Sequence, residues 1–135
     1  MTDILIGATG ESNLLVTNDI AISFLELTDA RVLGTPWLIL NLEITARNLV
    51  KPYLLDTQDT VGTQVNVAHL AATPLGMKAR FCAEILRVEG KRVTFRVEAF
   101  DQQDKIAEGT HERYIIDIAR FASRVAAKRD AAFKE

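Results

Sequence analysis

Glu43, His69 and Thr35 have side chains that can take part in acid–base or nucleophilic chemistry. Glu43 is a lone carboxylate in an apolar stretch; burying it unpaired is costly, so the residues alone favour an i,i+4 ion pair with Arg47. His69 lies in an alternating apolar run, and a histidine on such a face is more often a hydrogen-bonded core residue than a catalyst. Thr35, directly before Pro36, is sufficiently explained as the N-cap of a helix.

The element that carries Glu43 is a predicted helix over 35–50. Pro36 suits the first helical position, and Lys51-Pro52 ends the helix because the residue before a proline is pushed out of the α region. A helix whose apolar residues cover most of its circumference is usually covered on several sides. That set comprises Trp37, Leu38, Ile39, Leu40, Leu42, Ile44, Ala46, Leu49 and Val50.

Period-two alternation and turn residues predict five strands. The first covers 14–25, with a bend or bulge at Asn18-Asp19, and the others cover 60–70, 78–88, 92–101 and 106–117. In the 60–70 strand one face is expected to hold Val61, Thr63, Val65, Val67 and His69. Asp117 is expected to cap a final amphipathic helix. Its predicted inward face comprises Ile118, Phe121, Ala122 and Val125, and its basic residues Arg120, Arg124, Lys128 and Arg129 lie near the other side.

This order of elements predicts an α+β hotdog fold, in which an antiparallel sheet wraps around a central buried helix and a C-terminal helix follows. We expect one such domain over 1–135. The exposed edges and the open side of the sheet need cover, so we expect a symmetric homodimer. The sequence leaves open whether the assembly is a dimer or a tetramer.

Composition excludes several function classes. The 135 residues are 48% hydrophobic and 25% charged, with a formal net charge of −2, which is typical of a globular domain and gives no electrostatic basis for binding nucleic acid or an anionic membrane. Cys82 is the only cysteine, so a disulfide framework and a clustered cysteine zinc site are excluded. No run resembles a signal peptide or a membrane span, so we expect a cytoplasmic protein.

Four segments together resemble the hotdog-fold thioesterases related to fluoroacetyl-CoA thioesterase. The likeness covers nearly the whole chain, from about the first strand to Asp117. The segments are Val61-Gly62-Thr63 with 69–76 (HLAATPLG), then 88–95 (VEGKRVTF), then 109–113 (GTHER). In that family a threonine stands eight residues before a catalytic glutamate, and a histidine follows the glutamate by twenty-six. Thr35, Glu43 and His69 match in type and in both intervals.

The resemblance implies a thioesterase that hydrolyses a short or medium acyl-CoA, with CoA as part of the substrate and no metal or redox cofactor. It implies that Glu43 is the nucleophile or general base, and that His69 polarises a hydroxyl or water and then protonates the departing thiolate. Gly62 would let the thioester approach a backbone N–H that stabilises the oxyanion. Arg113 would contact acyl or CoA groups, although without the resemblance Arg113 and His111 suit a solvated strand face.

The sequence departs from the family at the aromatic gating residues that precede the family's threonine. Here the corresponding region, 24–31, reads FLELTDAR, with Asp29 at the place of an aromatic residue. The resemblance therefore supports thioesterase chemistry rather than a fluorinated substrate.

Spacing raises a difficulty for a site within one chain. If Thr35 and Glu43 bracket eight helical residues, their Cα atoms lie about 12 Å apart at about 1.5 Å per residue. They meet at one thioester only if Thr35 lies in a loop that folds back or if two protomers contribute, so we place the site at or near a dimer interface. Two alternatives are a non-catalytic acyl-CoA-binding sensor and a hotdog hydratase or dehydratase, although the Asp/His hydration motif of the latter is not found.

Overall fold

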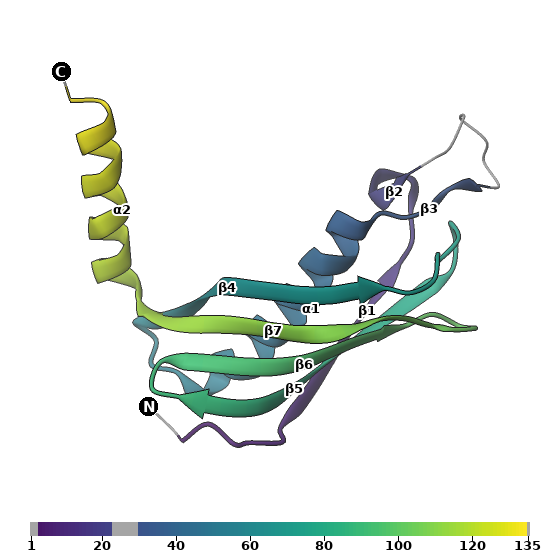
Figure 1. Cartoon of the computed structure of the whole chain (residues 1–135), viewed down its shortest axis with the longest axis horizontal. Helices are drawn as coiled ribbons and strands as arrows, with labels where there is room; N and C mark the ends of the chain where they lie inside the picture. The colour runs from purple at the N-terminus through teal and green to yellow at the C-terminus, as the bar shows by residue number, and fades with distance from the viewer. Residues whose placement is uncertain (1–2, 23–29, 135) are drawn as a thin grey trace.

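The computed structural model describes residues 3–22 and 30–134 of the chain. A sheet of order β1-β5-β6-β7-β4 packs against one long helix, α1, and a second helix, α2, follows the sheet (Figure 1). The main elements are β1 (Thr9–Leu15), α1 (Thr35–Val50), β4 (Gln58–His69), β5 (Lys78–Glu89), β6 (Arg92–Phe100), β7 (Lys105–Asp117) and α2 (Ile118–Ala132). Short elements are the 3-10 turns Asn18–Ile20 and Lys51–Tyr53 and the two-stranded ribbon of β2 (Ala21–Ile22) and β3 (Val32–Leu33).

The predicted central helix is confirmed, and α1 ends at Val50 before the 3-10 turn that contains Pro52. Its beginning differs by one position from the prediction. Gly34 is the N-cap and Thr35 is the first helical residue, and no side chain caps the helix. The prediction that Thr35 is the N-cap is therefore wrong, because its hydroxyl has another partner.

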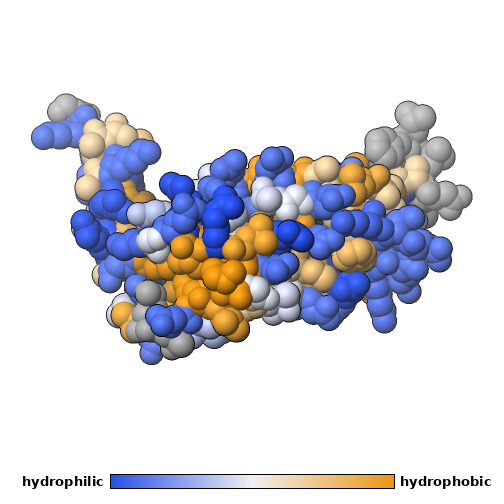
Figure 2. Space-filling model, turned by 60° about the horizontal axis from the view of Figure 1, so that its bottom comes forward, coloured by the Kyte–Doolittle hydropathy of each residue, from blue (hydrophilic) through white to orange (hydrophobic). Residues whose placement is uncertain are grey.

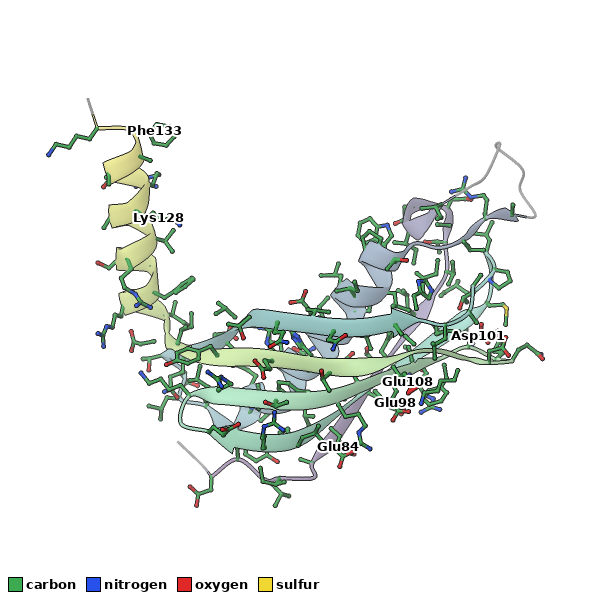
Figure 3. All side chains as sticks on the ribbon, viewed as in Figure 1. Glu84, Glu98, Asp101, Glu108, Lys128 and Phe133 are labelled. Carbon is green, nitrogen blue, oxygen red and sulfur yellow. The ribbon has the colours of Figure 1, made fainter. Side chains whose placement is uncertain are left out.

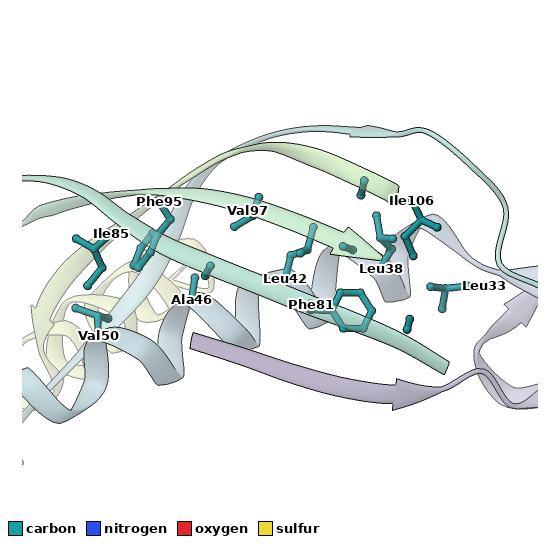
Figure 4. Close-up of a cluster of buried hydrophobic side chains, with 14 of the residues drawn as sticks. Leu33, Leu38, Leu42, Ala46, Val50, Phe81, Ile85, Phe95, Val97 and Ile106 are labelled. Atoms are coloured by element: carbon teal, nitrogen blue, oxygen red, sulfur yellow. The ribbon is translucent and has the colours of Figure 1, made fainter. Parts of the chain in front are cut away.

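The core lies between α1 and the sheet (Figure 4). Leu38, Leu42, Ala46 and Val50, each four residues apart, form the buried stripe of the helix. They face buried sheet residues that include Phe81, Ile85, Phe95, Val97 and Ile106. This packing fixes the rotation of α1 about its axis and so fixes where its remaining side chains point.

The side of α1 that faces away from the sheet is not covered by the described part of the chain. Trp37, Leu40 and Ile44 are 40%, 43% and 41% exposed. Large apolar side chains that gather on one surface of a helix normally mark an interaction surface. On the side of the molecule seen in Figure 2, apolar side chains likewise gather in a patch surrounded by hydrophilic ones.

The four long strands after α1 are confirmed to within two residues, but the first strand is not. The prediction placed it at 14–25, whereas β1 covers Thr9–Leu15 and the chain then turns at Asn18–Ile20. Gly10, Ser12 and Asn13 have low strand propensity, and they are held extended because β1 pairs antiparallel with β5. Residues 23–25 of the predicted strand lie outside the described residues.

A bulge in β4 changes which side chains face α1. The register with β7 shifts between Gly62 and Gln64, which inserts one residue into the strand. Gly62 lies opposite Arg113, and His69 lies opposite the buried Ala107. The expectation that Val61 shares a face with His69 is therefore wrong, because Val61 lies opposite Tyr114 and the extra residue, Thr63, reverses the alternation.

The C-terminal helix α2 begins as predicted but packs differently. Asp117 is its N-cap, and its carboxylate accepts a hydrogen bond from the Arg120 backbone N–H at 3.0 Å. The helix projects away from the sheet (Figure 1) and none of its residues is buried. The predicted inward face is therefore wrong for this chain alone, since Ile118 and Val125 are 44% and 52% exposed. Within the described residues no helix is both long and apolar enough to cross a membrane.

Gly109 lies in β7 directly against the backbone of β4. A Cβ atom at this position would lie 2.0 Å from the Asn66 carbonyl oxygen, which belongs to the backbone and cannot move aside cheaply. We predict that Gly109→Ala lowers the free energy of unfolding by at least about 1–3 kcal/mol, the usual cost of overpacking, as measured by urea denaturation. Gly10→Ala is the control, since its Cβ would meet only Leu49 at 3.4 Å. Equal stability of the two variants would show that the strands are not so close.

Candidate active site

Thr35 and His69 form the first of two polar groups in the candidate site. The Thr35 Oγ1 lies 2.8 Å from the His69 Nδ1, which joins the first turn of α1 to the end of β4. The His69 Nε2 is buried and has no hydrogen-bond partner in the described part of the chain. A buried polar atom without a partner is costly, so an unpaired ring nitrogen indicates a position where another molecule completes the hydrogen bonding.

A cavity of about 340 Å³ opens beside this pair. Thr35 and His69 supply its polar groups, and the rest of its lining is mostly apolar. The other lining residues are Ile22, Val32, Leu33, Leu70, Ala71 and Ala72. Apolar walls with a few placed polar groups are typical of sites for small molecules.

Glu43 and Arg113 form the second polar group. The Glu43 Oε2 lies 3.3 Å from the Arg113 Nη1, and Arg113 is only 6% exposed. Arg113 also donates hydrogen bonds to the Thr60 hydroxyl at 2.7 Å and to the Thr60 carbonyl at 2.9 Å. Burial lowers the pKa of the Arg113 guanidinium, and the nearby Glu43 carboxylate opposes that shift. Arg113 is therefore a fixed cation that holds the carboxylate in place.

The predicted ion pair between Glu43 and Arg47 is wrong. Arg47 instead forms a bidentate pair with Asp59, with N–O distances of 3.0 and 2.6 Å. The Arg47 hydrogen bond holds the pKa of the Asp59 carboxyl below its usual value. This pairing leaves the Glu43 carboxylate, whose side chain is 36% exposed, to Arg113 and to whatever enters the site.

His111 belongs to this group, although sequence reasoning placed it with Arg113 on a solvated strand face. It is 2% exposed, its Nδ1 lies 2.8 Å from the Gln64 carbonyl oxygen, and its Nε2 lies 3.2 Å from the Arg113 Nη1. The carbonyl only accepts and the guanidinium only donates, so His111 is neutral with its hydrogen on Nδ1. Alternation with the apolar Ala107 and Ile115 of β7 is a sequence signal that could have identified the buried face.

Gly62 borders the Glu43 carboxylate. A Cβ at this position would lie 2.7 Å from the Glu43 Oε2 and 3.4 Å from atoms of Arg113 and His111. The absence of a side chain therefore leaves the room that the carboxylate occupies. The β-bulge begins at the same residue, so Gly62 serves both the bulge and this close approach.

Within one chain the two groups are apart. Gly62 and His69 are separated by seven residues of β4, which corresponds to about 23 Å at about 3.3 Å per residue. Thr35 and Glu43 are separated by eight residues of α1, or about 12 Å. The structure thus brings Thr35 to His69, and Glu43 to Gly62 and Arg113, but does not join the two groups.

Asp29 and most of the 24–31 segment lie outside the described residues. Among the residues that are described, no three or more His, Cys, Asp or Glu side chains are grouped so that they could hold a metal ion.

Comparison with known proteins identifies the family. The family FlK, described as fluoroacetyl-CoA-specific thioesterase, matches residues 16–119. The chain is also 37% identical over 100 residues to the fluoroacetyl-CoA thioesterase of Streptantibioticus cattleyicolor, covering 74% of this chain and 72% of that protein. The chain belongs to this thioesterase family. It is a thioester hydrolase, as the resemblance of its motifs implies.

Solved structures confirm the predicted hotdog fold of this thioesterase. The fluoroacetyl-CoA thioesterase FlK superposes with a TM-score of 0.86 at 30% identity, covering 93% of this chain and 98% of that chain. A Thermus thermophilus protein described as a thioesterase superfamily member superposes with a TM-score of 0.85 at 29% identity, covering 98% and 99%. A hot-dog-like protein from Thermanaerovibrio acidaminovorans has a TM-score of 0.83 at 22% identity, covering 96% and 93%, and supports the fold alone.

The buried neutral His111 predicts a pH-dependent stability. Burial lowers its pKa below 6.5, so below about pH 6.5 the unfolded chain takes up a proton that the folded chain does not, and stability is lost as the pH falls. We predict that the free energy of unfolding, measured in urea between pH 7.5 and 5, depends less on pH in His111→Gln than in the wild type. His69→Gln, which changes the other of the two histidines, should keep the dependence on His111. An unchanged slope in His111→Gln would contradict the assignment.

Proposed function

We propose that this thioesterase hydrolyses short or medium aliphatic acyl-CoA thioesters with Thr35, Glu43 and His69, and that each active site is shared by two copies of the chain. The observation that carries the proposal is the division of the polar residues into two groups, each with its own internal hydrogen bonds. Thr35 with His69 supplies a hydroxyl and an imidazole, and Glu43 with Arg113 supplies a carboxylate that lies against the backbone of Gly62.

Pairing of two β4 edges would join the groups. In the described part of the sheet β4 is an edge strand, with β7 on its other side. If two copies pair antiparallel about the midpoint of Gly62 and His69, Gly62 of one copy faces the partner's His69 with Cα atoms about 4.5–5.5 Å apart. The midpoint falls between Val65 and Asn66, in the part of β4 that is exposed on both faces. The register that completes the site is therefore centred on the surface most open to a partner.

The exposed side of α1 supports the same assembly. Trp37, Leu40 and Ile44 lie along the helix on either side of Glu43 and present an apolar surface without cover in the described chain. A second copy seated on the β4 edge would bury this surface, which is the cover that the apolar character of α1 predicts.

The chemistry follows from the two groups. A water molecule held by the Glu43 carboxylate is deprotonated as it attacks the thioester carbonyl carbon, or the carboxylate itself attacks and water then cleaves the acyl-enzyme. The carbonyl oxygen gains negative charge, which a backbone N–H near Gly62 would stabilise. The C–S bond breaks, and the thiolate takes a proton from the protonated ring of His69, which Thr35 orients. The proton released by the attacking water then passes through solvent to His69 and restores both groups. The net reaction consumes one water and releases one acid and one thiol.

The substrate class follows from the cavity beside Thr35 and His69. Its volume of about 340 Å³ and its aliphatic walls suit a short or medium apolar acyl chain. Among the described lining residues there is no lysine or arginine that could bind an acyl carboxylate. Structures of FlK variants have been solved with acetyl-CoA and with fluoroacetate and CoA, which supports CoA as the thiol carrier here.

We predict that Glu43→Gln lowers kcat for butyryl-CoA by about 10²–10⁴-fold, because an amide can neither attack nor take a proton. His69→Gln and Thr35→Ala should also lower kcat. Thiol release from acyl-CoAs of graded chain length is the measurement, and CoA binding should persist in all three variants.

Glu84→Gln is the matched control, since it removes a carboxylate from a different lining, that of the β1–β5–β6 surface. Full activity of Glu43→Gln would refute the mechanism. A wild-type protein that binds every acyl-CoA and releases no thiol would support the sensor alternative instead.

A further inference from the structure

We propose that a basic cavity at the base of α2 binds the phosphate groups of the nucleotide part of CoA. This inference rests on the proposed function, since it assigns the part of the substrate that lies beyond the thioester. The cavity has a volume of about 220 Å³ and is separate from the Thr35–His69 cavity. Its lining residues are Lys91, Tyr114, Ile115, Ile116, Asp117, Arg120, Phe121 and Arg124.

Three cations in this lining have no anionic partner among the residues that the structure describes. In the described residues no carboxylate oxygen lies within 4.0 Å of the charged groups of Lys91, Arg120 or Arg124, whereas Arg47 and Lys105 each have a carboxylate partner. Asp117 is the one acidic residue of the lining, and its carboxylate accepts the Arg120 backbone N–H as the helix cap. The cavity therefore carries a net positive charge that a phosphate would neutralise.

The three cations are held on fixed elements. Asp117 anchors the first turn of α2, and Arg120 and Arg124 are one turn apart on the same side of that helix. Lys91 lies in the β5–β6 turn, and its carbonyl accepts a hydrogen bond from the Ile115 N–H at 2.8 Å, which ties the turn to β7. A ligand thus meets a site whose backbone is already in place, which limits the entropy lost on binding.

Like charges at this spacing destabilise a helix when nothing lies between them. Lys128 extends the row by another turn, and α2 carries four cations and one carboxylate in a chain whose net charge is −2. Figure 3 shows Lys128 on α2 well away from Glu84, Glu98 and Glu108 on the sheet. A bound polyanion at the base of α2 would relieve the repulsion that these acidic residues are too distant to offset.

Two aromatic side chains give the cavity a second feature that suits a bound nucleotide. Tyr114 and Phe121 line it, and Tyr114 is 43% exposed. Aromatic rings beside cations are the combination that holds a stacked base next to its phosphates. Tyr114 follows Arg113, the residue that holds Glu43, along β7, and because side chains alternate along a strand the two lie on opposite faces of the sheet, separated from the open edge only by β4. The flexible pantetheine arm of CoA would connect the cavity to the thioester.

The test compares butyryl-CoA with butyryl-pantetheine, which carries the same thioester and no phosphate. We expect Arg120→Gln and Arg124→Gln each to raise KM for butyryl-CoA and Kd for free CoA about tenfold, with kcat unchanged, because each removes a charge-assisted hydrogen bond. Neither variant should change kcat/KM for butyryl-pantetheine. Lys128→Gln, on the same helix but outside the cavity lining, is the matched control and should leave both substrates unaffected.

Three other results would overturn the inference, and one would separate it from the proposed function. Unchanged CoA binding in both variants would overturn the inference, as would an equal loss on both substrates, or a loss of binding to anionic lipid vesicles or nucleic acid without a loss of CoA binding. If the wild type cleaves neither thioester but its CoA affinity still falls in the two variants, the nucleotide cavity stands and the proposed function fails.

Discussion

The buried guanidinium of Arg113 is the constraint on which the rest of the site depends. A cation at 6% exposure must be neutralised, and Arg113 reaches the Glu43 carboxylate, the Thr60 hydroxyl and carbonyl, and the His111 ring. Because Glu43 is on α1 and Arg113 on β7, the pair also couples the helix to the sheet. The side chain that would perform the chemistry is thus held by an interaction that the fold cannot easily give up.

A second constraint is the geometry of regular elements. An α-helix and a β-strand are too stiff to bring Thr35 to Glu43 or His69 to Gly62 within one chain. The same stiffness makes a two-fold arrangement effective, because one antiparallel pairing of β4 edges would build two identical sites at once. The exposed apolar side of α1 and the exposed middle of β4 are then consequences of the shared site rather than defects of packing.

Much of the fold could be predicted from the sequence, because α1 and the four strands after it have strong periodicity and clear turn residues. The intervals between Thr35, Glu43 and His69 pointed to the family that the comparisons confirm. Partners of charged side chains could not be predicted. Arg47 lies one helical turn from Glu43 and could have paired with it, and only the position of β4 in the fold shows that Arg47 binds Asp59 instead. The apolar face of α2 was visible in the sequence, but periodicity does not say whether a chain covers its own apolar face.

We propose that the carboxylate and the Thr35–His69 pair of each active site come from different copies. Co-refolding two inactive variants, Thr35→Ala and Glu43→Gln, in equal amounts and measuring thiol release tests this arrangement. A heterodimer would hold one site with both groups intact, so about a quarter of wild-type activity should return under random pairing. A mixture of Thr35→Ala with His69→Gln, which damages the same group twice, should stay inactive. No recovery in the first mixture, in heterodimers shown to have formed, would contradict the shared site.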